Sequence, residues 1–182
     1  SLEEAVEKLL RDSEENLKKN EEDVRRLLKK SKENADRLRD EVRKLLETAE
    51  REIKRLEDEG KISEEEAKKL REELKRILDD VDKKLREWER ALEEIERKVK
   101  RSLEEWRREL REIKDRVKKE DLDERLIRET EKDVKRRDEE HNTRTEREIR
   151  EAKKEDEKLN KEVRDTEKRL RDELRRVEER VR

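Results

Sequence analysis

Hydrophobic residues recur along the chain in columns spaced 18 residues apart, which is five turns of an α-helix. The first third of the chain holds the columns Val6/Val24/Val42, Leu9/Leu27/Leu45 and Leu10/Leu28/Leu46. The middle third holds Leu74/Leu92/Leu110, Ile77/Ile95/Ile113, Val81/Val99/Val117 and a column that runs from Leu70 through Trp88 to Trp106. This step matches the natural turn of the α-helix, so the pattern predicts straight helices, each with one apolar stripe.

The segment EDEGKISEEEA, which contains the only glycine of the chain, predicts the end of one helix and the start of the next. Gly60 suits the left-handed C′ position just beyond a helix. Ser63 and Glu66 have the spacing of a capping box, and Ile62 is placed to pack on Ala67 as a hydrophobic staple.

A second interruption, KKEDLDERLI, predicts another helix start, with Asp123 as the N-cap and Leu122 packing on Ile127. Ser1 and Glu4 repeat the capping-box spacing at the beginning of the chain. The expected helices cover about residues 2–58, 64–119 and 124–181. Equal lengths and short connections predict an all-α fold, an antiparallel up-down-up three-helix bundle, with residues 1–182 forming one elongated domain.

Composition leaves two classes of protein open, a disordered chain or long helices with a narrow apolar stripe. Charged residues make up 65% of the 182 residues and hydrophobic residues 26%, with no Pro, Cys, Met, Phe or Tyr. Disordered polar chains carry no periodic stripe, whereas three stripes of matching length can bury one another. The pattern therefore favours the folded bundle.

Charge and residue usage exclude several kinds of partner. The 58 basic and 60 acidic residues are interleaved and nearly cancel, so no basic stripe predicts nucleic-acid or anionic-membrane binding. The chain has no long apolar run and no signal-peptide pattern, which predicts a soluble protein whose location stays unknown. The lack of cysteine excludes disulfides and thiolate metal sites. We expect no cofactor and no small-molecule substrate.

Polar residues repeat within the stripes at the same 18-residue step, and an antiparallel register brings them level with the two tryptophans. Residue n of the first helix should lie level with about residue 121 − n of the second. An indole N–H is a donor, a carboxylate is an acceptor, and Ser and Asn can be either, so each level can form a hydrogen-bond network. The two predicted sets are Ser13, Asn16, Trp106 and Asp138, and Ser31, Asn34, Trp88 and Asp156.

The stretch DEEHNTRT holds the only histidine, His141, on a helix face shared with Asp138 and Thr145. A catalytic triad with Ser13 would require an oxyanion hole and a cleft, which straight helices do not evidently supply. Zinc or di-iron binding would require more ligands than this one Asp-x-x-His pair. The favoured interpretation is a buried histidine bridging Asn20, Asp138 or Thr145, and a solvent-facing or interface position is the alternative.

Near-identical repeats create a register problem, because a slip of one whole repeat would keep most contacts. His141, Asn20 and Thr145 break the repeat, since their counterparts are Leu159, Leu38 and Val163. Buried polar groups generally reduce stability but can fix register. We therefore predict no catalytic, metal or cofactor site and a structural network of buried polar residues, namely Ser13, Asn16, Asn20, Ser31, Asn34, Trp88, Trp106, Asp138, His141, Thr145 and Asp156.

Equal helices with an 18-residue period, capping boxes, Glu/Lys/Arg-rich surfaces and an EGKIS loop resemble computationally designed, parametric helical bundles. The repeated polar sets resemble designed bundles with explicit hydrogen-bond networks. The resemblance covers the whole chain and implies a thermostable scaffold that is not an enzyme and has no natural substrate. The third helix departs from the pattern between Asp138 and Asn160, where it is more polar than an all-apolar layer.

A monomeric scaffold is the favoured interpretation of the chain. The alternative is an interaction module whose open seam binds a further helix or a second copy, which the column Leu10/Leu28/Leu46 and the polar third helix would support. A natural spectrin-like spacer is a third alternative, and the strictness of the period disfavours it.

Overall fold

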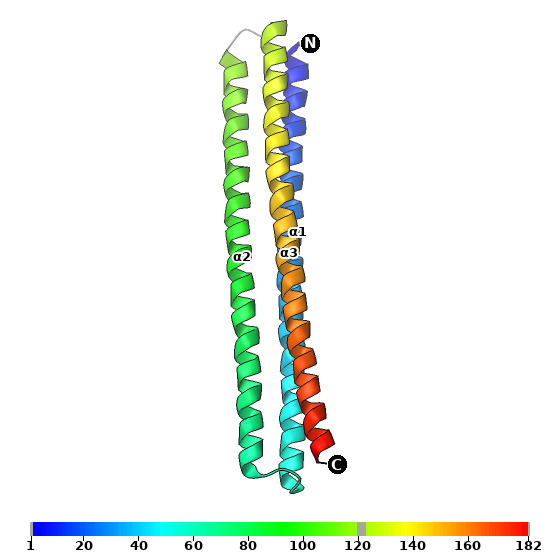
Figure 1. The fold of residues 1–182 in the computed structure, drawn as a ribbon. Coiled ribbons are helices and arrows are strands. Elements are labelled where there is room, and N and C mark those ends of the chain that lie inside the picture. The colour runs from blue at the N-terminus through cyan, green and yellow to red at the C-terminus, as the bar shows by residue number, and fades with distance from the viewer. Residues whose placement is uncertain (1, 120–122, 182) are drawn as a thin grey trace. The chain divides into compact units, whose positions relative to one another are not determined.

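The computed structural model describes residues 2–119 and 123–181, which form three α-helices and no strand (Figure 1). The helices are α1 (Leu2–Asp58), α2 (Glu64–Lys119) and α3 (Glu124–Arg180), and each bound lies within one residue of the expected one. The all-α three-helix bundle predicted from the sequence is confirmed. No helix in the described part of the chain is both long enough and apolar enough to cross a membrane.

Contacts between the helices divide the chain into two compact units, and each unit takes a stretch from all three helices. Unit 1 comprises Ser1–Lys30 and Leu92–Lys153, and unit 2 comprises Ser31–Ala91 and Lys154–Arg182. The 18-residue step relates positions in one unit to positions in the other. Each unit can therefore be compared with the other as an internal repeat.

Polar contacts give the directions of the helices within each unit. Between α1 and α2 the partner's number falls as the residue number rises, as in an antiparallel pair: Glu14–Lys114 and Glu21–Arg107 in unit 1, and Arg39–Glu89 and Glu50–Arg71 in unit 2. Between α1 and α3 both numbers rise together, as in a parallel pair: Ser13–Asp138 and Asn20–Asn142 in unit 1, and Ser31–Asp156 and Asn34–Asn160 in unit 2. Each unit has the up-down-up order.

The turn between α1 and α2 lies in unit 2 and contains the only left-handed residue among those described, Gly60 with φ of 69°. The backbone N–H of Lys61 donates to the carbonyl of Leu56 at 2.9 Å, which closes a Schellman motif around this glycine. Ser63 caps α2, because its hydroxyl accepts the N–H of Glu66 at 3.0 Å. The turn is therefore held by the residues that the sequence marks for it.

Apolar residues of the same turn pack into the core of unit 2. Ile62 and Ala67 are both buried, as a hydrophobic staple requires. They belong to a cluster completed by Ile53, Leu56 and Val177, so the turn is anchored to both α1 and α3.

The start of α3 lies in unit 1 and is capped by Asp123, whose carboxylate accepts the N–H of Leu126 at 2.8 Å. Leu122 and Ser1 lie outside the described residues. The packing of Leu122 on Ile127 and the capping box of Ser1 with Glu4 therefore stay predictions.

Candidate functional site

Serine–aspartate hydrogen bonds join α1 to α3 in both units, at positions 18 residues apart. In unit 2 the Ser31 hydroxyl donates to the Asp156 carboxylate at 2.6 Å, and in unit 1 the Ser13 hydroxyl donates to Asp138. Both serines are only 1% exposed. A buried hydroxyl without a partner costs about 1–3 kcal/mol, so each contact favours a carboxylate that turns inward from α3.

Trp88 completes the polar set of unit 2. Its indole N–H donates to the second oxygen of Asp156 at 2.8 Å, so one carboxylate links all three helices. The structure thus brings together Ser31, Trp88 and Asp156. The fourth residue predicted for this set, Asn34, instead donates to Asn160 at 2.9 Å.

Trp106, the counterpart of Trp88 in unit 1, makes different contacts. Its ring is completely buried and stacks on the ring of His141, with centroids 5.2 Å apart and planes inclined by 5°. Its indole N–H lies near Asp138 but outside hydrogen-bonding geometry, so the N–H has no partner. The stack on His141 takes the place of the indole–carboxylate bond seen in unit 2.

Asn16 is not part of the buried network, and the prediction that placed it there is wrong. Its side chain is exposed. The asparagine of α1 that reaches α3 in this unit is Asn20, one helical turn further along, which donates to Asn142 at 2.6 Å. Because Asn20 already occupies that acceptor, nothing holds Asn16 against α3.

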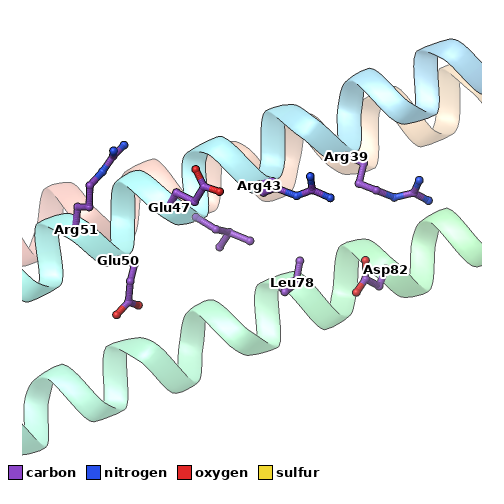
Figure 2. A pocket seen from close by; sticks show the side chains of 8 residues that line it. Arg39, Arg43, Glu47, Glu50, Arg51, Leu78 and Asp82 are labelled. Atoms are coloured by element: carbon purple, nitrogen blue, oxygen red, sulfur yellow. The ribbon is translucent and has the colours of Figure 1, made fainter.

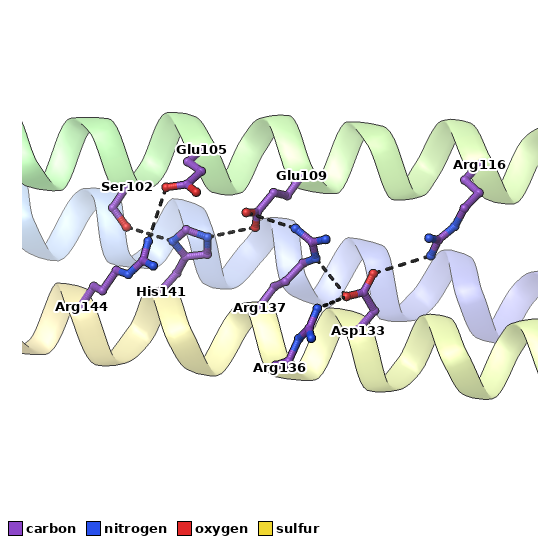
Figure 3. A network of polar contacts seen from close by, with 9 residues as sticks. All are labelled: Ser102, Glu105, Glu109, Arg116, Asp133, Arg136, Arg137, His141 and Arg144. Carbon is purple, nitrogen blue, oxygen red and sulfur yellow. Dashed lines mark hydrogen bonds and ion pairs between the residues drawn. The ribbon is translucent and has the colours of Figure 1, made fainter.

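His141 is 2% exposed, and both of its ring nitrogens face residues of α2 (Figure 3). Nδ1 lies 2.9 Å from the hydroxyl of Ser102, and Nε2 lies 3.1 Å from a carboxylate oxygen of Glu109. The histidine is buried, as expected, but none of the predicted partners Asn20, Asp138 and Thr145 is bonded to it. The physical reason is geometric: the imidazole points toward α2, whereas Asp138 bonds to α1 through Ser13.

Glu109 extends this contact into a chain of charged groups (Figure 3). Its second oxygen lies 3.1 Å from Arg137, whose Nε donates to Asp133 at 3.0 Å. Burial acts to raise the pKa of Glu109, but hydrogen bonds from His141 and Arg137 overcome it and hold this pKa below its ordinary value. The pKa of Asp133 is also lowered, because Arg137 and other neighbouring arginines outweigh burial. Both carboxyl groups are therefore held in their ionised forms.

Asp138 shows the opposite shift. Burial raises the pKa of its carboxyl above the ordinary 3.8, and the Ser13 hydroxyl, the Trp106 indole and the His141 ring offset burial only in part. The folded protein therefore binds a proton at Asp138 more readily than the unfolded chain does. The resulting stabilisation is complete below pH 3.8 and is lost as the pH rises through the folded-state pKa.

We expect Asp138→Asn to stabilise the protein at pH 7 by less than about 1 kcal/mol, a small effect because the carboxylate is partly solvated. The amide oxygen can still accept the Ser13 hydroxyl, while the partly buried charge is removed. Urea denaturation of the parent and the variant should show a difference that shrinks as the pH falls toward 3.8.

Glu109→Gln is the control of opposite sign for this pH dependence. The pKa of the Glu109 carboxyl is lowered in the folded protein, so its ionised form stabilises the fold at neutral pH, and that stabilisation is lost as the pH falls. The Gln variant should be less stable than the parent at pH 7 and approach it in acid. A stability difference between Asp138→Asn and the parent that stays constant with pH would contradict a raised pKa at Asp138.

Two kinds of site that were considered from the sequence and not favoured, a metal site and a serine triad, can be compared with this geometry. No group of three or more His, Cys, Asp or Glu side chains among the described residues is arranged to hold a metal ion. A Ser13–His141–Asp138 triad, which the sequence did not favour, does not form, since Asp138 bonds to Ser13 and the imidazole bonds elsewhere. The serine that does contact the imidazole is Ser102.

Sequence reasoning missed Ser102 and Glu109, although a spacing signal was present. Ser102, Trp106 and Glu109 are spaced i, i+4, i+7, which places them on one face of α2. Their counterparts in unit 2 are Lys84, Trp88 and Ala91, so only the tryptophan repeats. A break in the repeat on both α2 and α3 at the same level would have pointed to this contact.

The fold and its core together define a class: an all-α three-helix bundle in which hydrogen-bonded polar side chains lie among apolar ones. Comparisons of the chain with protein-family models, with curated proteins and with solved structures found no match.

Proposed function

We propose that this chain is a computationally designed structural scaffold in which buried polar contacts select one register of the helices. The strict 18-residue step, the capped helix ends and the repeated serine–aspartate bonds support a designed origin. The observation that carries the register role is a difference between the units. His141 of unit 1 is partnered at both nitrogens, whereas unit 2 has Leu159 at the corresponding position.

A slip by one 18-residue repeat shows why this difference matters. Most apolar contacts would be replaced by similar ones, since the columns repeat. His141, however, would be separated from Ser102 and Glu109 and would meet positions built for a leucine. Each buried polar group left without a partner costs about 1–3 kcal/mol, which penalises the slipped register and not the native one.

Replacing the three residues that break the repeat should remove this discrimination. We expect the variant Asn20→Leu/His141→Leu/Thr145→Val to be about as thermostable as the parent, because the apolar residues that unit 2 uses at these positions offset the partners lost by Ser102 and Asn142. It should also sample more than one register. The measurement is thermal unfolding by circular dichroism together with a two-dimensional amide NMR spectrum, in which we expect broadened or duplicated signals.

The variant Asn142→Leu/Asn160→Leu is a matched control. It removes one asparagine contact from each unit, so the units stay as distinguishable as before. Its spectrum should remain sharp and single. If the spectrum of the triple variant is as sharp as that of the parent, buried polar contacts do not select the register.

One feature of unit 2 favours the alternative function, an interaction module. Leu78 is 40% exposed and lies with Leu46 in a groove of about 720 Å³ between α1 and α2, surrounded by charged side chains (Figure 2). Leu10 and Leu28, the other members of the Leu46 column, are buried, so the column does not form a continuous open seam. Light scattering tests binding to a second copy, since a chain that does not self-associate should stay at 22.6 kDa at all concentrations.

A further inference from the structure

A cavity of about 290 Å³ lies between α2 and α3 in unit 1, beside the contact of Ser102 with His141. Ser102 and Thr145 both line it, and both residues are at least nine-tenths buried. Four cationic and two acidic side chains surround it, which gives an excess of positive charge: Lys98, Arg101, Arg144 and Arg147, with Glu105 and Glu148. The cavity suits a small, negatively charged molecule.

Glu109 determines which nitrogen of His141 carries the proton. Its carboxylate is ionised and also bound by Arg137, so it can only accept hydrogen bonds. In the neutral ring the proton therefore resides on Nε2, which faces Glu109, and Nδ1 is an acceptor. Ser102, 2.9 Å from Nδ1, then donates its hydroxyl proton toward the ring (Figure 3).

Thr145, which lines the cavity from α3, supplies a hydroxyl without a partner. Three other threonines, Thr48, Thr130 and Thr166, each donate to the carbonyl four residues earlier, the usual acceptor within a helix. The buried Thr145 hydroxyl makes no such bond and no other. It is therefore available as a donor to a molecule bound in the cavity.

We propose that Ser102 is an activated nucleophile that reacts with small, negatively charged, activated esters held in this cavity. His141 would act as the base, and Glu109 as a positioning residue that orients the ring and stabilises its cation. A hydroxyl, an imidazole and a carboxylate in hydrogen-bonded sequence form the general arrangement of an activated serine. Here Nδ1 faces the serine and Nε2 faces the acid.

The acylation step uses only side chains of the protein and the ester itself. Ser102 Oγ forms a bond to the ester carbonyl carbon while its proton moves to Nδ1 of His141. Thr145 donates to the carbonyl oxygen as that oxygen gains negative charge. The carbon–oxygen bond to the leaving group then breaks, and with a nitrophenyl ester the electron pair departs on 4-nitrophenolate.

Hydrolysis of the acyl group would regenerate the serine. After His141 releases its proton to solvent, a water molecule attacks the acyl carbon and passes a proton to Nδ1. The carboxylic acid then leaves as Ser102 Oγ recovers that proton. The inference goes beyond the scaffold function and does not rest on it, because register and reactivity are measured separately.

At the corresponding positions, unit 2 lacks the serine, the histidine, the glutamate and the threonine. The counterparts of Ser102, Glu109, His141 and Thr145 are Lys84, Ala91, Leu159 and Val163. The remaining network serines, Ser13 and Ser31, donate to the carboxylates of Asp138 and Asp156 and not to a histidine. Both serve as internal controls for the reactivity of a buried serine.

The test is acylation of the full chain by the 4-nitrophenyl monoester of glutaric acid, with neutral 4-nitrophenyl acetate as the comparison. Released nitrophenolate is followed by absorbance, and peptide mapping with and without hydroxylamine separates a labile ester on serine from stable amides on lysines. We expect an ester adduct at Ser102 and none at Ser13 or Ser31. The anionic ester should react several-fold faster at low salt, and this advantage should decline as salt is added.

Variants assign the roles. Ser102→Ala should abolish the labile adduct, and His141→Gln should slow its formation about 100-fold. Glu109→Gln should slow it about 10-fold and change its pH profile, whereas Ser13→Ala should leave it unchanged. Circular dichroism checks folding, and if His141→Gln does not fold, Glu109→Gln decides. The proposal is overturned if Ser102 carries no labile adduct. It is also overturned if His141→Gln or Glu109→Gln forms the adduct as fast as the parent does.

Discussion

Replacing Trp106 with alanine should lower the free energy of unfolding by about 3–5 kcal/mol, the largest loss expected from one substitution in this core. The indole is completely buried and is stacked on His141. Its removal would leave a large cavity and would take away the surface on which the imidazole rests. Urea denaturation followed by circular dichroism at 222 nm measures the loss, and Trp88 remains as a fluorescent probe of unit 2.

Phenylalanine variants of the two tryptophans separate packing from hydrogen bonding. Trp106→Phe removes an N–H that has no partner, whereas Trp88→Phe removes one that is bonded to Asp156 at 2.8 Å. Trp88→Phe should therefore destabilise the protein by about 1 kcal/mol more than Trp106→Phe does. Equal losses in the two variants would show that the two indoles do not differ in hydrogen bonding.

The helices could be predicted because independent signals coincide at their ends. The apolar columns stop where Gly60 provides a left-handed residue, and Ser63 and Asp123 then supply the side-chain oxygens that cap the following helices. Each signal has a local physical cause, and none depends on a contact distant in sequence. Helix bounds within one residue of those expected follow from such local causes.

Periodicity also identified polar residues that face the core, but it did not determine how they pair. A column fixes the side of the helix on which a residue lies, which is why Ser31 and Asp156 meet. Two asparagines one turn apart, Asn16 and Asn20, lie close enough in angle to compete for one acceptor. Asn142 repeats as Asn160, but the choice of Asn20 over Asn16 as its donor depends on side-chain rotamers, which the repeat does not encode.

The partners of His141 could not be identified from the sequence, because the composition of the chain makes them look like ordinary surface residues. In a chain with 65% charged residues, Glu109 resembles any other surface glutamate, and the face that Ser102 shares with Trp106 does not by itself identify a partner on α3. Only the three-dimensional pairing of α2 with α3 brings both against the imidazole. A break in the repeat marks the level of such a contact on each helix, but the sequence does not say which side chains meet there.

Asp156→Ala should lower the free energy of unfolding by about 2–4 kcal/mol. The carboxylate accepts both the Ser31 hydroxyl and the Trp88 indole N–H, and its loss leaves two buried donors without a partner. Asp138→Ala is the matched comparison from the other unit and should cost about half as much, because only Ser13 donates to that carboxylate. Urea denaturation of both variants at pH 7 provides the measurement.

Removing the donors together with the acceptor tests the cause of that loss. In Ser31→Ala/Trp88→Phe/Asp156→Leu no polar group is left unpaired, and leucine is the residue that this column carries at position 174. The triple variant should therefore be more stable than Asp156→Ala, since replacing all members of a buried polar set by apolar groups can be nearly neutral. If the triple variant is less stable than Asp156→Ala, the carboxylate is not retained for its two donors. If the triple variant regains the stability lost in Asp156→Ala, the polar set specifies which residues meet and adds little net stability. A register-selecting role for the core requires the same.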